Sequence, residues 1–205
     1  MEKKGLLIVI SGFSGVGKGT VVKRLVSDYG YSLSISATTR APREGEVDGR
    51  EYYFKSKEEF KNLIDYNGFI EWAVYVENYY GTPRAFVEKE LAAGHNVILE
   101  IEVQGAMNIK EQYPDAVLIF LTAPNAEELK QRLIGRGTEE ASVVEKRMKR
   151  AMEESEDMNQ YEYIVINDDL DQCVKDVNSV IVAKGCMIEN NIEYVNQMKA
   201  ELKAL

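Results

Sequence analysis

The sequence predicts an α/β fold in which a parallel central sheet is flanked by helices. Short apolar, β-branched runs alternate with helical patterns, and this alternation is typical of βαβ units whose strands are buried on both faces. A glycine-rich segment follows the first of these runs directly and opens the first helical pattern. The 205 residues, of which 45% are hydrophobic and 29% charged, provide enough chain to bury one substantial core.

Five runs are expected to form the sheet, and helices are expected between them. The four continuous apolar runs span residues 6–10, 97–101, 117–121 and 163–166, and a weaker fifth run spans residues 33–35. The helical patterns span residues 18–28, 84–93, 126–135 and 141–160. The third helix has a marked start, because Asn125 is followed three residues later by Glu128, as in a capping box. The fourth has no sustained heptad, so we expect no coiled coil.

Residues 38–82 depart from this pattern. They are rich in Tyr, Arg, Gly and Glu, and residues 70–75 have partial strand character. Because the stretch lies between units of the parallel pattern, it predicts an inserted lobe of mixed β-strands. No internal repeat, low-complexity segment or Pro/Ser-rich linker divides the chain, so a single domain is expected.

Composition excludes several classes of protein. The net charge of −9 argues against a general nucleic-acid binder, since polyanion binding needs a positive field. No apolar run approaches the ~18–20 residues that span a bilayer, and residues 6–10 are too short for a signal-peptide core, so a cytoplasmic protein is expected. His95 is the only histidine, which excludes a histidine-based metal cluster. Cys173 and Cys186 have no zinc-like spacing and are expected to be buried, reduced thiols.

The strongest signal is the segment GFSGVGKGT at residues 12–20, between the first strand and the first helix. Its glycines allow consecutive backbone N–H groups to point inward at phosphate oxygens, and the helix N-terminus adds its positive end. Lys18 is expected to bridge the β- and γ-phosphates, with the alternative that this is a glycine-rich turn with a surface lysine. The expected nucleotide-binding residues here are Ser11, Gly12, Phe13, Ser14, Gly15, Val16, Gly17, Lys18, Gly19 and Thr20.

One position departs from the general phosphate-loop pattern. That pattern places Ser or Thr directly after the lysine, where its hydroxyl binds Mg²⁺. Here Gly19 holds that place and Thr20 follows. We therefore assign no residue as a direct metal ligand, and expect Mg²⁺ to be held mainly by nucleotide phosphates and water.

Several motifs in order resemble the guanylate kinase family. They read TTRAPREGEVDGREYYF at residues 38–54, FIEWA at 69–73, NYYGT at 78–82, LEIEVQG at 99–105, RLIGRGTE at 132–139 and INDD at 166–169. The resemblance covers residues 5 to about 183. It implies a phosphotransferase of purine nucleotide metabolism that converts ATP and GMP to ADP and GDP, with dGMP as an expected second acceptor. ATP and GMP are then its partners, and no nucleic acid, membrane or obligatory protein partner is expected.

The resemblance assigns the inserted lobe to GMP. Arg40 and Arg43 match family positions that bind the GMP phosphate, and the planar fork of arginine suits that dianion. Tyr52 and Tyr80 match positions that donate hydroxyls to the same phosphate. The alternative for the arginine pair is a solvated loop charge.

Guanine recognition is assigned to carboxylates and hydroxyls. Guanine presents N1–H and an amine as adjacent donors, which a carboxylate can accept, while hydroxyls can address O6. By the family match Glu71 and Glu102 face these donors, and Ser36 and Thr82 approach O6. A structural salt bridge is the alternative for Glu71. The family often has Asp at the position of Glu102, and the longer side chain is expected to preserve the function.

The remaining assignments concern the lid and the metal. The basic segment near residues 130–150 resembles the family's lid, which implies that Arg132, Arg136 and Arg147 reach the transferring phosphoryl group, with Asn167 near the ATP adenine. Lys18, Arg136 and Arg147 are the expected catalytic residues. Glu100 lies two residues before Glu102 on one strand face and is a candidate for positioning the Mg²⁺ hydration shell, with a structural role as the alternative.

The domain then divides into a core of about residues 1–37, 83–125 and 151–205, a GMP-binding lobe of about 38–82 and a lid of about 126–150. Two rival functions stay open at this point. A kinase for another nucleoside monophosphate shares the phosphate loop but not the motifs of residues 38–82. A non-catalytic guanylate-kinase-like interaction module typically has an impaired phosphate loop, whereas Lys18 and the loop glycines are present here.

Overall fold

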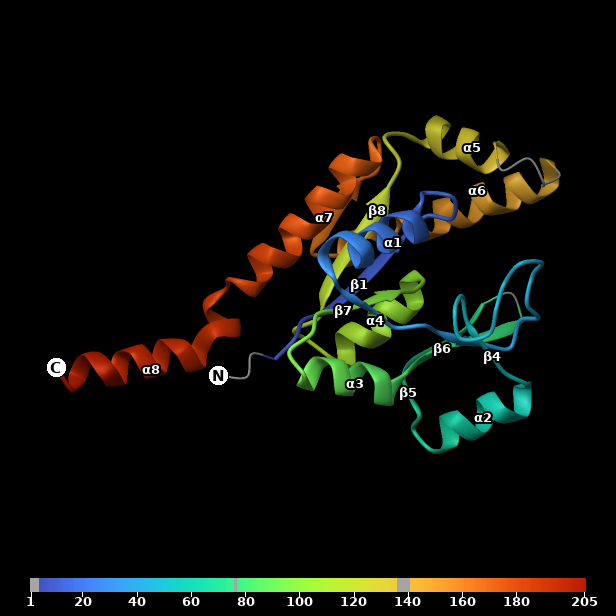
Figure 1. Cartoon of the computed structure of the whole chain (residues 1–205). Coiled ribbons are helices and arrows are strands. Elements are labelled where there is room, and N and C mark those ends of the chain that lie inside the picture. Colours follow the sequence, from blue (N-terminus) through green and yellow to red (C-terminus); the bar gives the residue numbers. More distant parts are fainter. Residues whose placement is uncertain (1–3, 76, 136–140) are drawn as a thin grey trace.

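A five-stranded parallel sheet forms the centre of the computed structural model, which describes residues 4–75, 77–135 and 141–205 (Figure 1). The strands lie in the order β2-β7-β1-β8-β9, and every neighbouring pair is parallel. The expected α/β class and the five expected runs are confirmed. The strands are β1 (Leu7–Gly12), β2 (Ser32–Leu33), β7 (Val97–Glu100), β8 (Val117–Thr122) and β9 (Tyr163–Ile166).

Burial on both faces explains the continuous apolar runs. All six residues of β1 are buried, and their side chains alternate between two layers. Ile8 and Ile10 pack with residues of α1 (Lys18–Tyr29) and α7 (Leu170–Gly185), whereas Leu7 and Val9 pack with residues of α3 (Arg84–Ala92) and α4 (Val103–Gln112). The carboxyl end of β1 leads directly into the glycine-rich loop, so the core holds that loop in place.

The helices match three of the four expected ranges within one residue at each end. The predicted helix at 141–160 ends earlier, at Ser155, and a short 3₁₀ turn at Met158–Gln160 follows. The Asn125 side chain accepts a hydrogen bond from the Glu128 amide at 2.8 Å, which confirms the expected start of its helix. The α-helices outside the inserted lobe are α1 (Lys18–Tyr29), α3 (Arg84–Ala92), α4 (Val103–Gln112), α5 (Ala126–Ile134), α6 (Ala141–Ser155), α7 (Leu170–Gly185) and α8 (Ile192–Lys203).

The inserted lobe has a mixed sheet of its own, as expected. Its strands lie in the order β4-β3-β6-β5, with β3 and β4 parallel and the other pairs antiparallel. A small core that includes Phe60 and Phe69, whose rings stack 4.5 Å apart, packs beneath it. The elements are α2 (Lys57–Asp65), β3 (Ala37–Thr38), β4 (Tyr53–Phe54), β5 (Phe69–Tyr75) and β6 (Asn78–Pro83).

The C-terminal helix α8 extends away from the body of the molecule (Figure 1). A hollow of about 640 Å³ lies between the start of α8, the start of β1 and the turn before β8. This hollow lies at the amino end of β1, opposite the glycine-rich loop. None of the helices in the described ranges is both long and apolar enough to cross a bilayer.

The two cysteines differ in exposure. Cys173 is buried in α7, and burial raises the pKa of its thiol to about 11. Cys186 follows α7 and is exposed, so the expectation that both thiols are buried is wrong for Cys186. The residue lies at the C-cap of α7, where the chain leaves the core.

Candidate active site

The glycine-rich loop has a backbone shape that larger residues would disturb. Gly12, at the end of β1, has φ 149°, and a Cβ there would lie 2.2 Å from the Leu121 carbonyl oxygen. Gly17 caps α1 with φ 97°, and a Cβ there would lie 2.8 Å from Nδ2 of Asn167. The loop is therefore pressed against its neighbours and opens on the N-terminus of α1, a geometry suited to phosphate.

Lys18 is the first residue of α1 and reaches back across the loop. Its Nζ donates to the Gly12 carbonyl oxygen at 2.5 Å and lies 4.0 Å from a carboxylate oxygen of Glu102. The side chain is only 10% exposed. The ammonium group is thus held at the mouth of the phosphate loop, between the carboxyl ends of β1 and β7.

Glu100 lies beside the one position where the loop departs from the general pattern. A Cβ at Gly19 would lie 3.6 and 3.7 Å from the two Glu100 carboxylate oxygens. Burial raises the pKa of Glu100, and the nearby Lys18 charge opposes that shift. The carboxylate therefore faces the place where other phosphate loops present a hydroxyl. In the described part of the chain, no three His, Cys, Asp or Glu side chains are arranged to hold a bare metal ion.

Asn167 follows the edge strand β9 and connects the glycine-rich loop to that edge of the sheet. The side-chain Nδ2 of Asn167 donates to the Val16 carbonyl oxygen at 2.8 Å, and the backbone carbonyl oxygen of Asn167 accepts from Arg132 Nη1 at 2.7 Å. Arg132 also pairs with Glu128 on α5 at 2.9 Å. Sequence reasoning assigned Asn167 to the nucleotide, and it did not anticipate that this side chain holds the loop itself.

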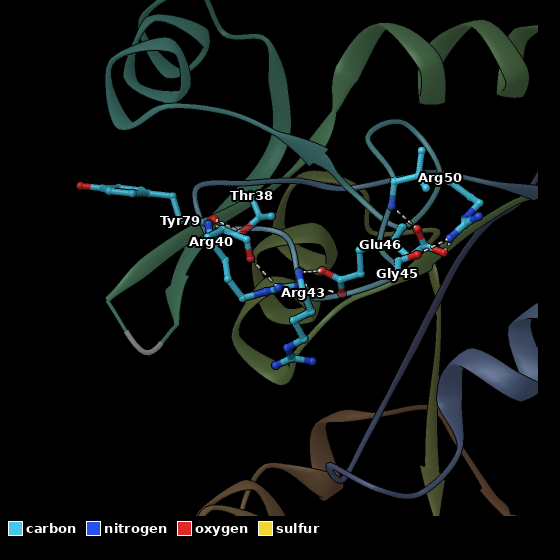
Figure 2. A network of polar contacts seen from close by, with 10 residues as sticks. Thr38, Arg40, Arg43, Gly45, Glu46, Arg50 and Tyr79 are labelled. Atoms are coloured by element: carbon cyan, nitrogen blue, oxygen red, sulfur yellow. Dashed lines mark hydrogen bonds and ion pairs between the residues drawn. The ribbon is translucent and has the colours of Figure 1, made fainter. Parts of the chain in front are cut away.

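In the loop after β3, the side chain of Arg40 bonds to Glu46, whereas Arg43 bonds to Glu46 through its backbone (Figure 2). Arg40 Nη2 lies 2.9 Å from Glu46 Oε1, while Glu46 Oε2 accepts from the Arg43 backbone amide at 2.7 Å. The Arg43 guanidinium extends away from this network. One carboxylate therefore orients the Arg40 side chain and shapes the backbone that carries Arg43.

Two tyrosines lie next to Arg40. The ring of Tyr52 is 6.0 Å from that of Tyr80, and the Arg40 guanidinium carbon lies 5.3 Å from the Tyr52 ring centroid. Burial raises the pKa of Tyr52 to about 12, and the negative charge of Glu100 adds to that rise. The Tyr52 hydroxyl therefore stays protonated at neutral pH and can donate a hydrogen bond.

Glu71 is a buried carboxylate held by one neighbour. Strand register places Glu71 of β5 opposite Thr82 of β6, and the Thr82 hydroxyl donates to Glu71 Oε1 at 2.6 Å. Glu71 is 6% exposed, and burial raises the pKa of its carboxyl to about 7 while the Thr82 bond lowers it. The predicted salt-bridge alternative is absent for Glu71 among the described residues, because no cation pairs with it there.

The structure brings most of the expected site residues to one edge of the two sheets. Glu102 occupies the N-cap position of α4, and the first turn of that helix lies against Glu71. Ser36 is half-buried beside β3, and its carbonyl oxygen accepts from the Tyr53 amide. Arg147 is half-buried on α6, and α6 packs against α5. Arg136 lies outside the described residues.

Sequence reasoning also missed Glu154 of α6. This residue is 4% exposed and accepts from Arg150 Nε at 3.0 Å, and burial raises the pKa of its carboxyl. The charges of Glu102 and Lys18 both act on it. Burial of a Glu within a strongly charged helix gives no periodic signal, so only the fold shows that Glu154 is buried.

Comparisons with known proteins agree on one family. The model of the guanylate kinase family matches residues 4–184. The chain is 52% identical over 206 aligned positions to guanylate kinase of Lactiplantibacillus plantarum, covering 100% of both chains. It is 48% identical over 202 residues to guanylate kinase of Caldanaerobacter subterraneus subsp. tengcongensis, covering 98% of each.

Solved structures give the same result. The fold is similar to that of guanylate kinase from Anaplasma phagocytophilum, with a TM-score of 0.77 and 30% identity, over 91% of this chain and 89% of that one. A gluconokinase from Sinorhizobium meliloti shares the fold alone, with a TM-score of 0.51 and 16% identity over 89% of this chain and 94% of that one.

Proposed function

The chain belongs to the guanylate kinase family, and on that premise we propose which of its residues carry out the reaction. The enzyme transfers a phosphoryl group from ATP to GMP, giving ADP and GDP. The observation that carries the assignment of roles is that Lys18 of the phosphate loop lies 4.0 Å from Glu102, which begins the helix whose first turn lies against the buried Glu71 carboxylate. GMP and ATP are thus its two substrates, and each has its own set of side chains.

Four cations are proposed to act on the γ-phosphoryl group. Lys18 leaves the Gly12 carbonyl oxygen and neutralises charge on the β- and γ-phosphates, while Arg132, Arg136 and Arg147 act from the lid side. A GMP phosphate oxygen attacks the phosphorus in line, so no protein nucleophile is required. Catalysis then rests on positioning and on stabilising the charge that develops in the transition state.

The acceptor is held at both ends. Arg40, Arg43, Tyr52 and Tyr80 bind the GMP phosphate, with Arg40 oriented beforehand by Glu46. Guanine N1–H and its amine donate to Glu71 and Glu102, and Ser36 and Thr82 address O6. A carboxylate accepts only, so it matches two adjacent donors, whereas adenine offers no donor at N1.

Mg²⁺ is proposed as the companion of ATP, where it offsets phosphate charge and orients the oxygens for transfer. The residues fit a hydrated ion. Glu100 faces the space beside Gly19, with its carboxylate oxygens 3.6 and 3.7 Å from where a Cβ of residue 19 would lie. A carboxylate in this place can accept hydrogen bonds from metal-bound water. Glu100 would hold the hydration shell, and the nucleotide phosphates would supply the inner contacts.

Arg43→Met tests the phosphate site of GMP. Since the guanidinium extends away from the loop network, its loss should spare folding. A lost charge-assisted phosphate contact should raise KM for GMP roughly 10- to 100-fold. KM for ATP should stay within about twofold, as measured by ADP release in a coupled assay.

The matched control lies in the same loop. Arg50 pairs with Glu51 and with the Gly45 carbonyl oxygen, outside the proposed phosphate site. Arg50→Met should therefore leave both KM values nearly unchanged. Equal effects of the two substitutions on KM for GMP would contradict the proposed phosphate site.

The titration of Glu71 predicts how GMP binding depends on pH. The Glu71 carboxyl has a pKa of about 7 in the free protein, because it is buried. Guanine needs the ionised form, so GMP binding releases a proton below that pH. KM for GMP should rise about tenfold per pH unit as pH falls below 7, while KM for ATP stays flat.

GMP itself titrates near pH 6 through its phosphate, so the control must retain that titration. Glu71→Gln retains it and removes only the carboxyl. The difference between the two KM profiles from pH 5.5 to 8.5 isolates Glu71. Parallel profiles would show that Glu71 does not titrate against guanine.

A further inference from the structure

Gly105 lies on the first turn of α4, directly against the Glu71 carboxylate. A Cβ at this position would lie 2.8 Å from Glu71 Oε2, 3.4 Å from Glu71 Cδ and 3.3 Å from Ile101 Cδ1. Real Cβ atoms essentially never approach another heavy atom more closely than 3.0 Å. Any side chain at residue 105 therefore requires the Glu71 carboxylate to move.

Glu71 has little freedom to move away. Its other oxygen is held by the Thr82 hydroxyl at 2.6 Å, and its backbone is fixed by pairing with Thr82 across β5 and β6. The side chain is 6% exposed, so its surroundings are closely packed. Pushing Oε2 away from α4 would strain or break the bond to Thr82.

Backbone conformation does not explain the glycine. Gly105 is absent from the glycines with positive φ and lies within regular helix. Alanine is generally favoured over glycine in a helix, because glycine loses more backbone freedom. The glycine is therefore explained by the space it leaves, and that space is filled by the Glu71 carboxylate.

The contact also gives Glu71 a favourable electrostatic neighbour. Ala106 is the first residue of α4 whose amide finds an acceptor within the helix region, the Glu102 carbonyl oxygen at 3.0 Å. The amides of the preceding turn, including that of Gly105, form the positive end of the helix. These amides offset part of the cost of burying the Glu71 carboxylate in its ionised form.

We propose that Gly105 is a positioning residue for guanine recognition: by lacking a side chain, it lets the Glu71 carboxylate rest on the N-terminal turn of α4. The inference rests on the proposed role of Glu71 toward guanine. Gly105 itself is not expected to touch a substrate and acts only through Glu71. The first turn of α4 therefore contributes to guanine specificity, with Glu102 at the N-cap position of the same helix.

Gly105→Ala is the direct test. Displacing the carboxylate should weaken a charged hydrogen bond to guanine and raise KM for GMP at least about tenfold. At saturating GMP, kcat should stay within about threefold, and KM for ATP should stay within about twofold. Gln104→Ala is the matched control, because it changes an exposed side chain on the same helical turn and should leave all three values nearly unchanged.

A double-mutant cycle separates this role from a general effect on the helix. In a Glu71→Gln background, Gly105→Ala should add little to KM for GMP, because the group it displaces is already impaired. Full additivity of the two effects, or an unchanged KM in Gly105→Ala alone, would overturn the proposal. Normal GMP kinetics in Glu71→Gln would instead overturn the proposed role of Glu71, so the two failures are distinguishable.

A stability measurement covers the case in which Gly105→Ala folds poorly. Glu71→Asp shortens the side chain by one methylene group and withdraws the carboxylate from residue 105. If the clash with Glu71 is responsible, adding Glu71→Asp should recover most of the Tm lost by Gly105→Ala. If Tm is not recovered, the clash lies elsewhere, for example at Ile101, and the proposal is wrong.

Discussion

Lys18→Met is expected to lower kcat by at least about 100-fold, the scale on which losing one preorganised electrostatic donor slows a reaction. Lys18 begins α1 and already lies at the mouth of the phosphate loop, bonded to the Gly12 carbonyl oxygen. In the proposed mechanism it moves to the β- and γ-phosphates as charge develops there. GMP binding should change little, since most of the proposed GMP side chains lie on the inserted lobe, with Glu102 at the start of α4 as an exception.

The experiment compares kcat, KM for GMP and folding by circular dichroism. Lys175→Met removes the same charge from an exposed position on α7 and serves as the control. The control should retain normal turnover. Near-normal turnover in a folded Lys18→Met protein would contradict the phosphate-loop mechanism.

Glu71→Gln is expected to lower kcat/KM for GMP roughly 10- to 150-fold, because a donor amide would face a guanine donor in place of a charged acceptor. KM for ATP should be spared. The variant keeps the shape of the side chain, so the loss reports on hydrogen bonding and charge. Unchanged GMP kinetics would show that Glu71 does not read guanine.

The same substitution should stabilise the free protein. Burial raises the pKa of Glu71 from 4.5 to about 7, so the folded state disfavours ionisation and loses stability as pH rises from 4.5 to 7. By linkage the loss amounts to up to about 3 kcal/mol above pH 7. Glu71→Gln should therefore raise the free energy of unfolding at pH 8 and have little effect near pH 4.5. Urea unfolding at both pH values measures this, and destabilisation at pH 8 would show that the ionised carboxylate is well satisfied without GMP.

Much of the core could be predicted from local sequence patterns. Strands buried on both faces read as continuous apolar runs, and the glycine-rich loop has a fixed place between such a strand and a helix. Helix α4 was missed because its ten residues include Gly105 and follow the strand almost directly. Helix α2 was missed because the tyrosine-rich lobe around it obscured its capping box at Ser56.

The site was predicted through motifs, and its long-range contacts were not. Nothing near Asn167 in the sequence indicates that its amide bonds to Val16, which lies 151 residues earlier. Likewise the approach of Gly105 to Glu71 depends on how α4 packs on β5 of the lobe. Such contacts depend on the tertiary arrangement of elements, which local periodicity does not encode.

If a buried carboxylate selects guanine, the selection should be visible in the relative kcat/KM of the wild-type enzyme for GMP, AMP and dTMP. Adenine would leave buried acceptors unpaired, and a site built to bond a substrate can discriminate by about 10⁴-fold for that reason. The panel also includes dGMP, which keeps the base and the phosphate and is expected to be accepted. GMP should be preferred over AMP and dTMP by about that factor, whereas equal or better use of AMP or dTMP would show that the site does not select guanine.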